Sequence, residues 1–155
     1  MITIDTATSP GQIDQARALF IEYGESLGFD LCFQDYDTEL KNLPGEYAPP
    51  DGQLLLAYFN NEPVGCVALR KFGESTCEMK RLYVRPPFRG LGIGRRLAED
   101  IIDGARQRGY RIMRLDTIAT MFEAINLYKS LGFQERDSYR FNPLEDARYF
   151  ELTLF

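Results

Sequence analysis

The stretch Glu78-Met79-Lys80-Arg81-Leu82-Tyr83-Val84-Arg85-Pro86-Pro87-Phe88-Arg89-Gly90-Leu91-Gly92-Ile93-Gly94-Arg95-Arg96 decides the fold. Its first part is typical of a β-strand, the two prolines indicate a turn, and an amphipathic helix follows the glycines. Gly90, Gly92 and Gly94 allow the backbone to approach a ligand closely, and the free N–H groups of a helix N-terminus attract an anion. The stretch therefore predicts a strand, a pyrophosphate-binding loop and a helix.

Two common phosphate-binding motifs do not match this loop. A dinucleotide-binding G-x-G-x-x-G motif that starts at Gly90 needs glycine at position 95, where this chain has Arg95. A P-loop needs Gly-Lys followed by serine or threonine, and the stretch has no such tripeptide.

Length and charge narrow the classes of function. The chain has 155 residues, which is the size of one domain, so we expect residues 1–155 to form a single domain. The net charge is −5, but residues 80–114 contain ten basic and three acidic side chains, a local net charge of +7. A local basic segment in an acidic chain favours a small anionic ligand over a nucleic-acid partner.

Several residue types are scarce, and this excludes common chemistries. The chain has no histidine, which removes the Ser–His and Cys–His nucleophile pairs and the usual zinc sites, so we expect no metal. The three cysteines, Cys32, Cys66 and Cys77, lack the spacing of a disulfide framework and suit a reducing, cytoplasmic setting. We expect no signal peptide, since the N-terminus has no basic region before an apolar run, and no membrane partner.

The remaining segments predict an α+β fold. The expected strands and helices give a mixed, mostly antiparallel sheet of about seven strands flanked by about four helices, with a parallel βαβ crossover after the third strand of a meander. The expected strands are residues 2–5, 53–59, 63–70, 76–84, 110–117, 133–139 and 148–154. The expected helices are residues 13–27, introduced by a cap at Ser9, and residues 35–43, 94–108 and 121–131.

These elements and two motifs resemble the GNAT superfamily of acyl-CoA-dependent N-acetyltransferases. Arg89-Gly90-Leu91-Gly92-Ile93-Gly94 is similar to the family's cofactor signature, and Leu127-Tyr128 with Gly132-Phe133 follows about 40 residues later. The resemblance covers nearly the whole chain and implies acetyl-CoA as co-substrate. It implies that the backbone of Leu82, Tyr83 and Val84 pairs with the pantetheine arm where two strands splay apart. The residues it assigns to the pyrophosphate are Arg89, Gly90, Leu91, Gly92, Ile93, Gly94 and Arg95.

The resemblance also implies catalytic residues. Tyr128 matches the tyrosine that protonates the leaving thiolate, and Glu78 matches a position where many members carry a catalytic glutamate. We expect Glu78 to take the proton of the amine, with Asp116 or water as the alternative base, and the N–H of Val84 to stabilise the oxyanion. Met121 stands where the family often has asparagine, which removes a side-chain hydrogen bond to the cofactor.

The acceptor is expected to be a small cationic amine, acetylated by direct transfer in a ternary complex. The candidate acceptor-binding residues are Tyr23, Asp30, Phe33, Asp116 and Tyr139, since acidic and aromatic side chains suit a cation. A peptide N-terminus or a lysine side chain is an alternative acceptor. A non-catalytic acyl-CoA-binding module is an alternative function. The sequence is also compatible with a homodimer.

Overall fold

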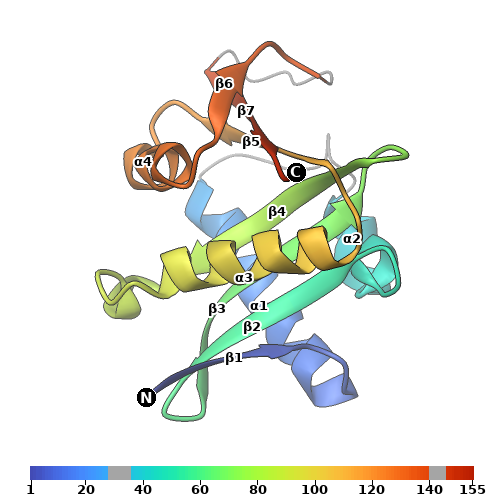
Figure 1. Cartoon of the computed structure of the whole chain (residues 1–155). Coiled ribbons are helices and arrows are strands. Elements are labelled where there is room, and N and C mark those ends of the chain that lie inside the picture. The colour runs from blue at the N-terminus through green and yellow to red at the C-terminus, as the bar shows by residue number, and fades with distance from the viewer. Residues whose placement is uncertain (28–35, 140–145) are drawn as a thin grey trace.

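The computed structural model describes residues 1–27, 36–139 and 146–155. Its strands and helices follow the expected order (Figure 1). The elements are β1 (Ile2–Thr6), α1 (Pro10–Leu27), α2 (Tyr36–Asn42), the 3₁₀ turn η2 (Gly45–Tyr47), β2 (Gln53–Phe59), β3 (Glu62–Lys71), β4 (Thr76–Val84), the 3₁₀ turn η3 (Pro86–Phe88), α3 (Ile93–Gln107), β5 (Ile112–Ile118), α4 (Phe122–Ser130), β6 (Gln134–Arg136) and β7 (Ala147–Thr153).

The seven strands form one sheet in the order β1-β2-β3-β4-β5-β7-β6. Every neighbouring pair is antiparallel except β4 and β5, which are parallel and joined by α3. The predicted α+β class, with a mostly antiparallel sheet and one βαβ crossover, is therefore confirmed. Figure 1 shows α3 across one face of the sheet and α1 on the opposite face.

Helices cover both faces because the strands alternate between two apolar cores. One core packs Leu97, Ile101 and other buried side chains of α3 against the sheet, and it continues to Ile125 and Tyr128 of α4. The other packs the buried face of α1 against Leu54, Leu56, Cys66 and Ala68. In β2 and β3, successive side chains therefore enter opposite cores, as a strand with two buried faces requires.

Local signals account for several element boundaries. The amide of Gln12 donates to Ser9 Oγ at 3.2 Å and the amide of Ser9 donates to Gln12 Oε1 at 3.2 Å, so α1 begins with the predicted capping box. Asn60 and Asn61 adopt φ values of 49° and 71°, the conformation that a tight hairpin turn between β2 and β3 needs.

Two expectations differ from the structure. The expected strand at residues 133–139 is a strand only over Gln134–Arg136, because Phe133 turns its ring into the core and pairing with β7 involves three residues of this edge. The expected loop at residues 43–52 contains η2, because Leu43 and Tyr47 are buried beneath α1 and fix its path. In the parts of the chain that are described, no helix is long and apolar enough to cross a membrane.

Candidate active site

A groove opens in the sheet where β4 and β5 separate. The two strands pair only over Thr76–Glu78 and Ile112–Arg114, although β4 continues to Val84 and β5 to Ile118. Beside this separation lies a cavity of about 590 Å³. Its lining residues are Tyr23, Ser26, Leu82, Tyr83, Val84, Phe88, Arg89, Gly90, Gly92, Ile93, Gly94, Thr120, Met121, Phe122, Glu123, Ala124 and Leu127.

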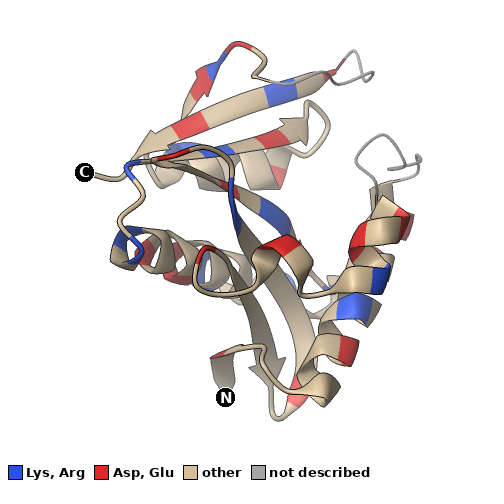
Figure 2. Ribbon diagram, turned by 90° about the vertical axis from the view of Figure 1, so that its right-hand side faces the viewer, with Lys and Arg blue, Asp and Glu red and all other residues tan. Residues whose placement is uncertain are grey.

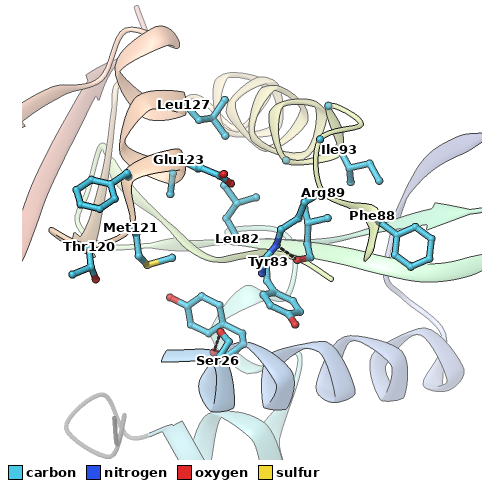
Figure 3. A pocket seen from close by; sticks show the side chains of 17 residues that line it. Ser26, Leu82, Tyr83, Phe88, Arg89, Ile93, Thr120, Met121, Glu123 and Leu127 are labelled. Atoms are coloured by element: carbon cyan, nitrogen blue, oxygen red, sulfur yellow. Dashed lines mark hydrogen bonds between the residues drawn. The ribbon is translucent and has the colours of Figure 1, made fainter. Parts of the chain in front are cut away.

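The side chains that line the groove come from several elements (Figure 3). In Figure 3, Leu127, Glu123 and Met121 lie on one side, and Arg89, Phe88 and Ile93 lie on the other. Leu82 and Tyr83 of β4 lie between them, and Ser26 of α1 lies below. A ligand in this groove would therefore run along β4 between α4 and the glycine loop.

Most of the residues assigned to the cofactor from the sequence lie in this groove. Leu82, Tyr83, Val84, Arg89, Gly90, Gly92, Ile93 and Gly94 all line it. Leu91 and Arg95 do not belong to the lining: Leu91 is half-exposed, and Arg95 turns to donate a hydrogen bond to Ser130 Oγ. The periodicity of α3 explains this difference, because Arg95 projects from a different side of the first turn than Ile93.

The loop before α3 is held open by glycines with positive φ. Gly90 and Gly92 have φ values of 85° and 81°, and a Cβ built on either would meet nothing within 4 Å. Gly92 is the N-cap residue of α3, and its backbone lets the first turn of the helix face the groove. Arg89 crosses beside this loop, donating from Nε to the Val84 carbonyl at 2.8 Å and lying 5.8 Å from the Tyr83 ring centre.

A β-bulge in β4 places charged side chains on the α1 face of the sheet. The pairing of β3 with β4 shifts between Cys66 and Ala68, and Arg81 adopts a φ of 61° at this point. The Arg81 guanidinium forms a bidentate ion pair with Glu39 of α2, at 2.8 and 2.9 Å. The Cys66 thiol donates to the Arg81 carbonyl at 3.3 Å. The bulge is thus anchored to α2 and β3.

Tyr128 packs into the core and is not among the residues that line the groove. It is 7% exposed, and its ring contacts the rings of Phe133 and Phe150 at centroid distances of 5.7 and 6.3 Å. Burial raises the pKa of Tyr128, and the charges of Tyr23 and Asp116 raise it further. The phenol is therefore protonated throughout the physiological pH range, which is the state that a proton donor requires.

Glu78 is fully buried on the α1 face of β4. Its Oε1 accepts from Arg70 Nε at 2.8 Å, and its Oε2 accepts from the Tyr139 hydroxyl at 2.7 Å. Arg70 also pairs with Glu46 at 2.5 Å. Tyr139, which the sequence assigned to the acceptor, is thus a hydrogen-bond partner of Glu78, and its ring packs 5.3 Å from that of Tyr149.

Of the acidic side chains on α1 and α2, Glu22 and Glu39 are held in ion pairs. Glu22 accepts hydrogen bonds from Arg85 Nε at 2.9 and 3.1 Å and from Arg85 Nη2 at 2.6 Å, while Glu25 and Asp37 are exposed. Tyr23, a candidate acceptor-binding residue, lines the groove. Asp30 and Phe33 lie outside the described residues, as does Cys32.

Sequence reasoning missed part of the groove wall. Thr120, Phe122 and Glu123 were not singled out, and neither was Ser26, while Leu127 was quoted in the family motif without a role in the groove. The sequence could have predicted that Ala124 and Leu127 lie near the groove, because Ala124 lies one helical turn before Tyr128 and Leu127 directly precedes Tyr128. Met121 also lines the groove, and its sulfur accepts a hydrogen bond from Thr117 Oγ1 at 3.5 Å.

Comparison with known proteins places this site in a family. The model of the acetyltransferase (GNAT) family matches residues 15–133. An uncharacterised N-acetyltransferase of Schizosaccharomyces pombe is 41% identical over 155 residues, covering 99% of this chain and 95% of its own. A GNAT-family acetyltransferase structure from Staphylococcus aureus covers 100% of both chains, with a TM-score of 0.83 and 22% identity.

A structure of an acetyltransferase from Salmonella typhimurium, described as putative and solved with its cofactor acetyl-CoA, has the same fold. It covers 99% of this chain and 94% of its own, with a TM-score of 0.73 and 22% identity. The groove between β4 and β5, the glycine loop before α3, the family match and the close relative agree. The chain therefore belongs to the GNAT family of acetyltransferases.

Proposed function

We propose that this protein binds acetyl-CoA in the groove between β4 and β5 and transfers the acetyl group directly to a primary amine. The observation that carries the proposal is the separation of β4 from β5, with the glycine loop and the N-terminus of α3 at the end of the same groove. A peptide-like arm and a pyrophosphate need these two features side by side.

The free edge of β4 suits the pantetheine arm. Among the described residues, no strand pairs with β4 on the β5 side beyond Glu78, so Leu82, Tyr83 and Val84 offer N–H and C=O groups to an extended ligand. An added strand gains main-chain hydrogen bonds in this way. The apolar side chains of Ala124 and Leu127 cover the opposite wall, where the methylene groups of the arm would be buried.

The loop at residues 89–95 suits the pyrophosphate. The open space at Gly90 and Gly92 admits phosphate oxygens to the backbone, and the N–H groups of the first turn of α3 supply donors and a favourable dipole. Arg89 adds a positive charge at the groove, whereas Arg95 would reach the ligand only after leaving Ser130. We assign the main electrostatic contact to Arg89.

We assign the leaving-group proton to Tyr128. The amine attacks the thioester carbonyl, the oxygen becomes anionic, and the N–H of Val84 is the donor assigned to that oxyanion. As the C–S bond breaks, the neutral phenol of Tyr128 protonates the thiolate. The phenol carries its proton at physiological pH even at the ordinary tyrosine pKa, and the raised pKa makes it a weaker acid, so the assignment rests on the place of Tyr128 in the family motif.

Neither of the cysteines in the described part of the chain suits an acyl-cysteine intermediate, which favours direct transfer. Cys66 and Cys77 are both buried, and burial raises the pKa of the Cys66 thiol and raises that of Cys77 to about 12. A thiol that stays protonated is a poor nucleophile. We therefore propose a ternary complex in which the amine itself attacks.

The test is an acetyl-transfer assay on a panel of amines, with detection of the free CoA thiol. The panel contains polyamines, amino acids, a peptide with a free N-terminus and a peptide with an internal lysine. The proposal expects acetylation of a small cationic amine. Selective acetylation of a peptide would redirect the acceptor assignment, and CoA binding without any transfer would favour a non-catalytic acyl-CoA-binding module.

A further inference from the structure

The two carboxylates considered as bases have different surroundings. Both oxygens of Glu78 already accept hydrogen bonds, one from Arg70 and one from Tyr139. In contrast, Asp116 Oδ2 is buried and has no hydrogen-bond partner among the described residues. A buried carboxylate oxygen without a partner is costly, so a donor group bound at Oδ2 would relieve that cost.

Asp116 lies on β5 at the separation of the two strands. The last pair between β4 and β5 is Glu78 with Arg114, and Asp116 follows two residues later on the same face of the sheet. Its partner across β7 is Tyr149. Asp116 is therefore placed just past the point where the groove opens, on the face that carries α1.

The charge of Asp116 acts on two tyrosines, one of which is the proposed proton donor. The charge of Asp116 raises the pKa of Tyr23 on α1 and that of Tyr128 on α4, in each case adding to the effect of burial. The other charged groups on this face include Glu78, Lys80 and Arg81 of β4, of which Arg81 lowers the pKa of Tyr23, and Arg114 of β5, which is paired with Glu151 at 2.9 Å. Asp116 thus lies within electrostatic range of the proposed proton donor, with the groove-lining Tyr23 beside it.

We propose that Asp116 binds the ammonium group of the acceptor through Oδ2 and accepts its proton, which makes Asp116 a catalytic residue and Glu78 a positioning residue. The inference rests on the proposed function, because it concerns the acceptor of the same transfer. Asp116 would supply the missing negative partner for a cation, and the Tyr23 ring would supply an aromatic neighbour.

The proton balance is complete without any other reactant. Asp116 takes one proton from the ammonium, and the freed electron pair of nitrogen forms the C–N bond. The C–S electron pair leaves with sulfur, which takes the proton of Tyr128. The second proton of the nitrogen restores the phenol of Tyr128, and Asp116 releases its proton to solvent. The net products are an amide, the CoA thiol and one proton.

The inference is tested with Asp116→Asn, using the best alkylamine acceptor of the panel. The expected result is a fall of about 10²–10⁴-fold in kcat/KM, with CoA affinity retained in calorimetry. The fall should be larger near about pH 7 than near about pH 10, because a free alkylamine becomes abundant only as the pH approaches its pKa of about 10.4. Asp100→Asn, the same change at an exposed site on α3, should behave like the wild type.

Glu78→Gln is the comparison that separates the two carboxylates. It should cost less activity per folded molecule than Asp116→Asn, and its loss should come with a lower melting temperature. Transfer by Asp116→Asn within about threefold of the wild type at both pH values would overturn the inference. Failure of the wild type to acetylate any amine would instead overturn the proposed function.

Discussion

Tyr139 donates its hydroxyl proton to Glu78 Oε2 at 2.7 Å, across 61 residues of sequence. With Arg70 on the other oxygen, this contact links β3, β4 and the segment after β6 around one buried carboxylate. The arrangement fixes Glu78 in place at the point where β4 leaves β5. Glu78 and Tyr139, which the sequence analysis expected to act on the substrate, are thus hydrogen-bonded to each other.

Glu78→Gln should destabilise the fold. Glutamine keeps the shape of the side chain but removes the charge that pairs with Arg70, so the cost should be roughly 2–4 kcal/mol in the free energy of unfolding. Tyr139→Phe removes one hydrogen bond to a charged group and should cost about 1.5–3 kcal/mol. Urea unfolding of the three proteins measures both values. Changes below about 0.5 kcal/mol in both variants would show that the contacts contribute little.

Tyr128→Phe should separate catalysis from packing. The ring contacts with Phe133 and Phe150 remain, so the melting temperature should stay close to that of the wild type. Loss of the proton donor should lower kcat by about 10²–10⁴-fold, with little change in CoA affinity. If kcat stays within about threefold while chemistry limits the rate, Tyr128 is a packing residue only.

Alkaline pH should weaken the fold through its buried tyrosines. Burial is the main cause that raises the pKa of Tyr23, Tyr36 and Tyr128, so their neutral forms are favoured in the folded state. In the unfolded chain they ionise near pH 10. Their contribution to stability is therefore complete below about pH 10 and is lost as the pH rises through the folded-state values.

Urea unfolding at about pH 8 and about pH 10.5 measures this effect, and the midpoint should be lower at the higher pH. Tyr128→Phe should reduce the difference, because it removes one of these buried phenols. An equal midpoint at both pH values would contradict the prediction.

The parts of the fold that follow from local sequence were predictable. The apolar period of Leu97, Ala98, Ile101, Ile102 and Ala105 places α3 within one residue at each end, and all five side chains are buried. The pair Asn60-Asn61 marks the hairpin between β2 and β3 because asparagine tolerates positive φ. The glycine loop was recognisable for the same reason, since few residues adopt its backbone conformation.

Contacts between distant parts of the chain were not predictable. Glu22 looks like a free acid on a helix, yet it pairs with Arg85, which is 63 residues away. Glu39 pairs with Arg81 only because the bulge in β4 turns that side chain toward α2. A charge pattern along the sequence does not reveal which charges neutralise each other in space. Figure 2 shows basic and acidic residues interspersed along the helices.

The most direct test of acetyl-CoA binding compares two glycine variants by isothermal titration with CoA. Gly92 and Gly109 have φ values of 81° and 85°, and a Cβ at either meets nothing within 4 Å, so valine should impose a similar strain of about 1–2 kcal/mol at both. Of these two glycines, Gly92 lines the groove and Gly109 does not. The account predicts that Gly92→Val loses CoA binding by at least about tenfold while Gly109→Val keeps wild-type affinity. Equal affinity in the two folded variants would contradict it.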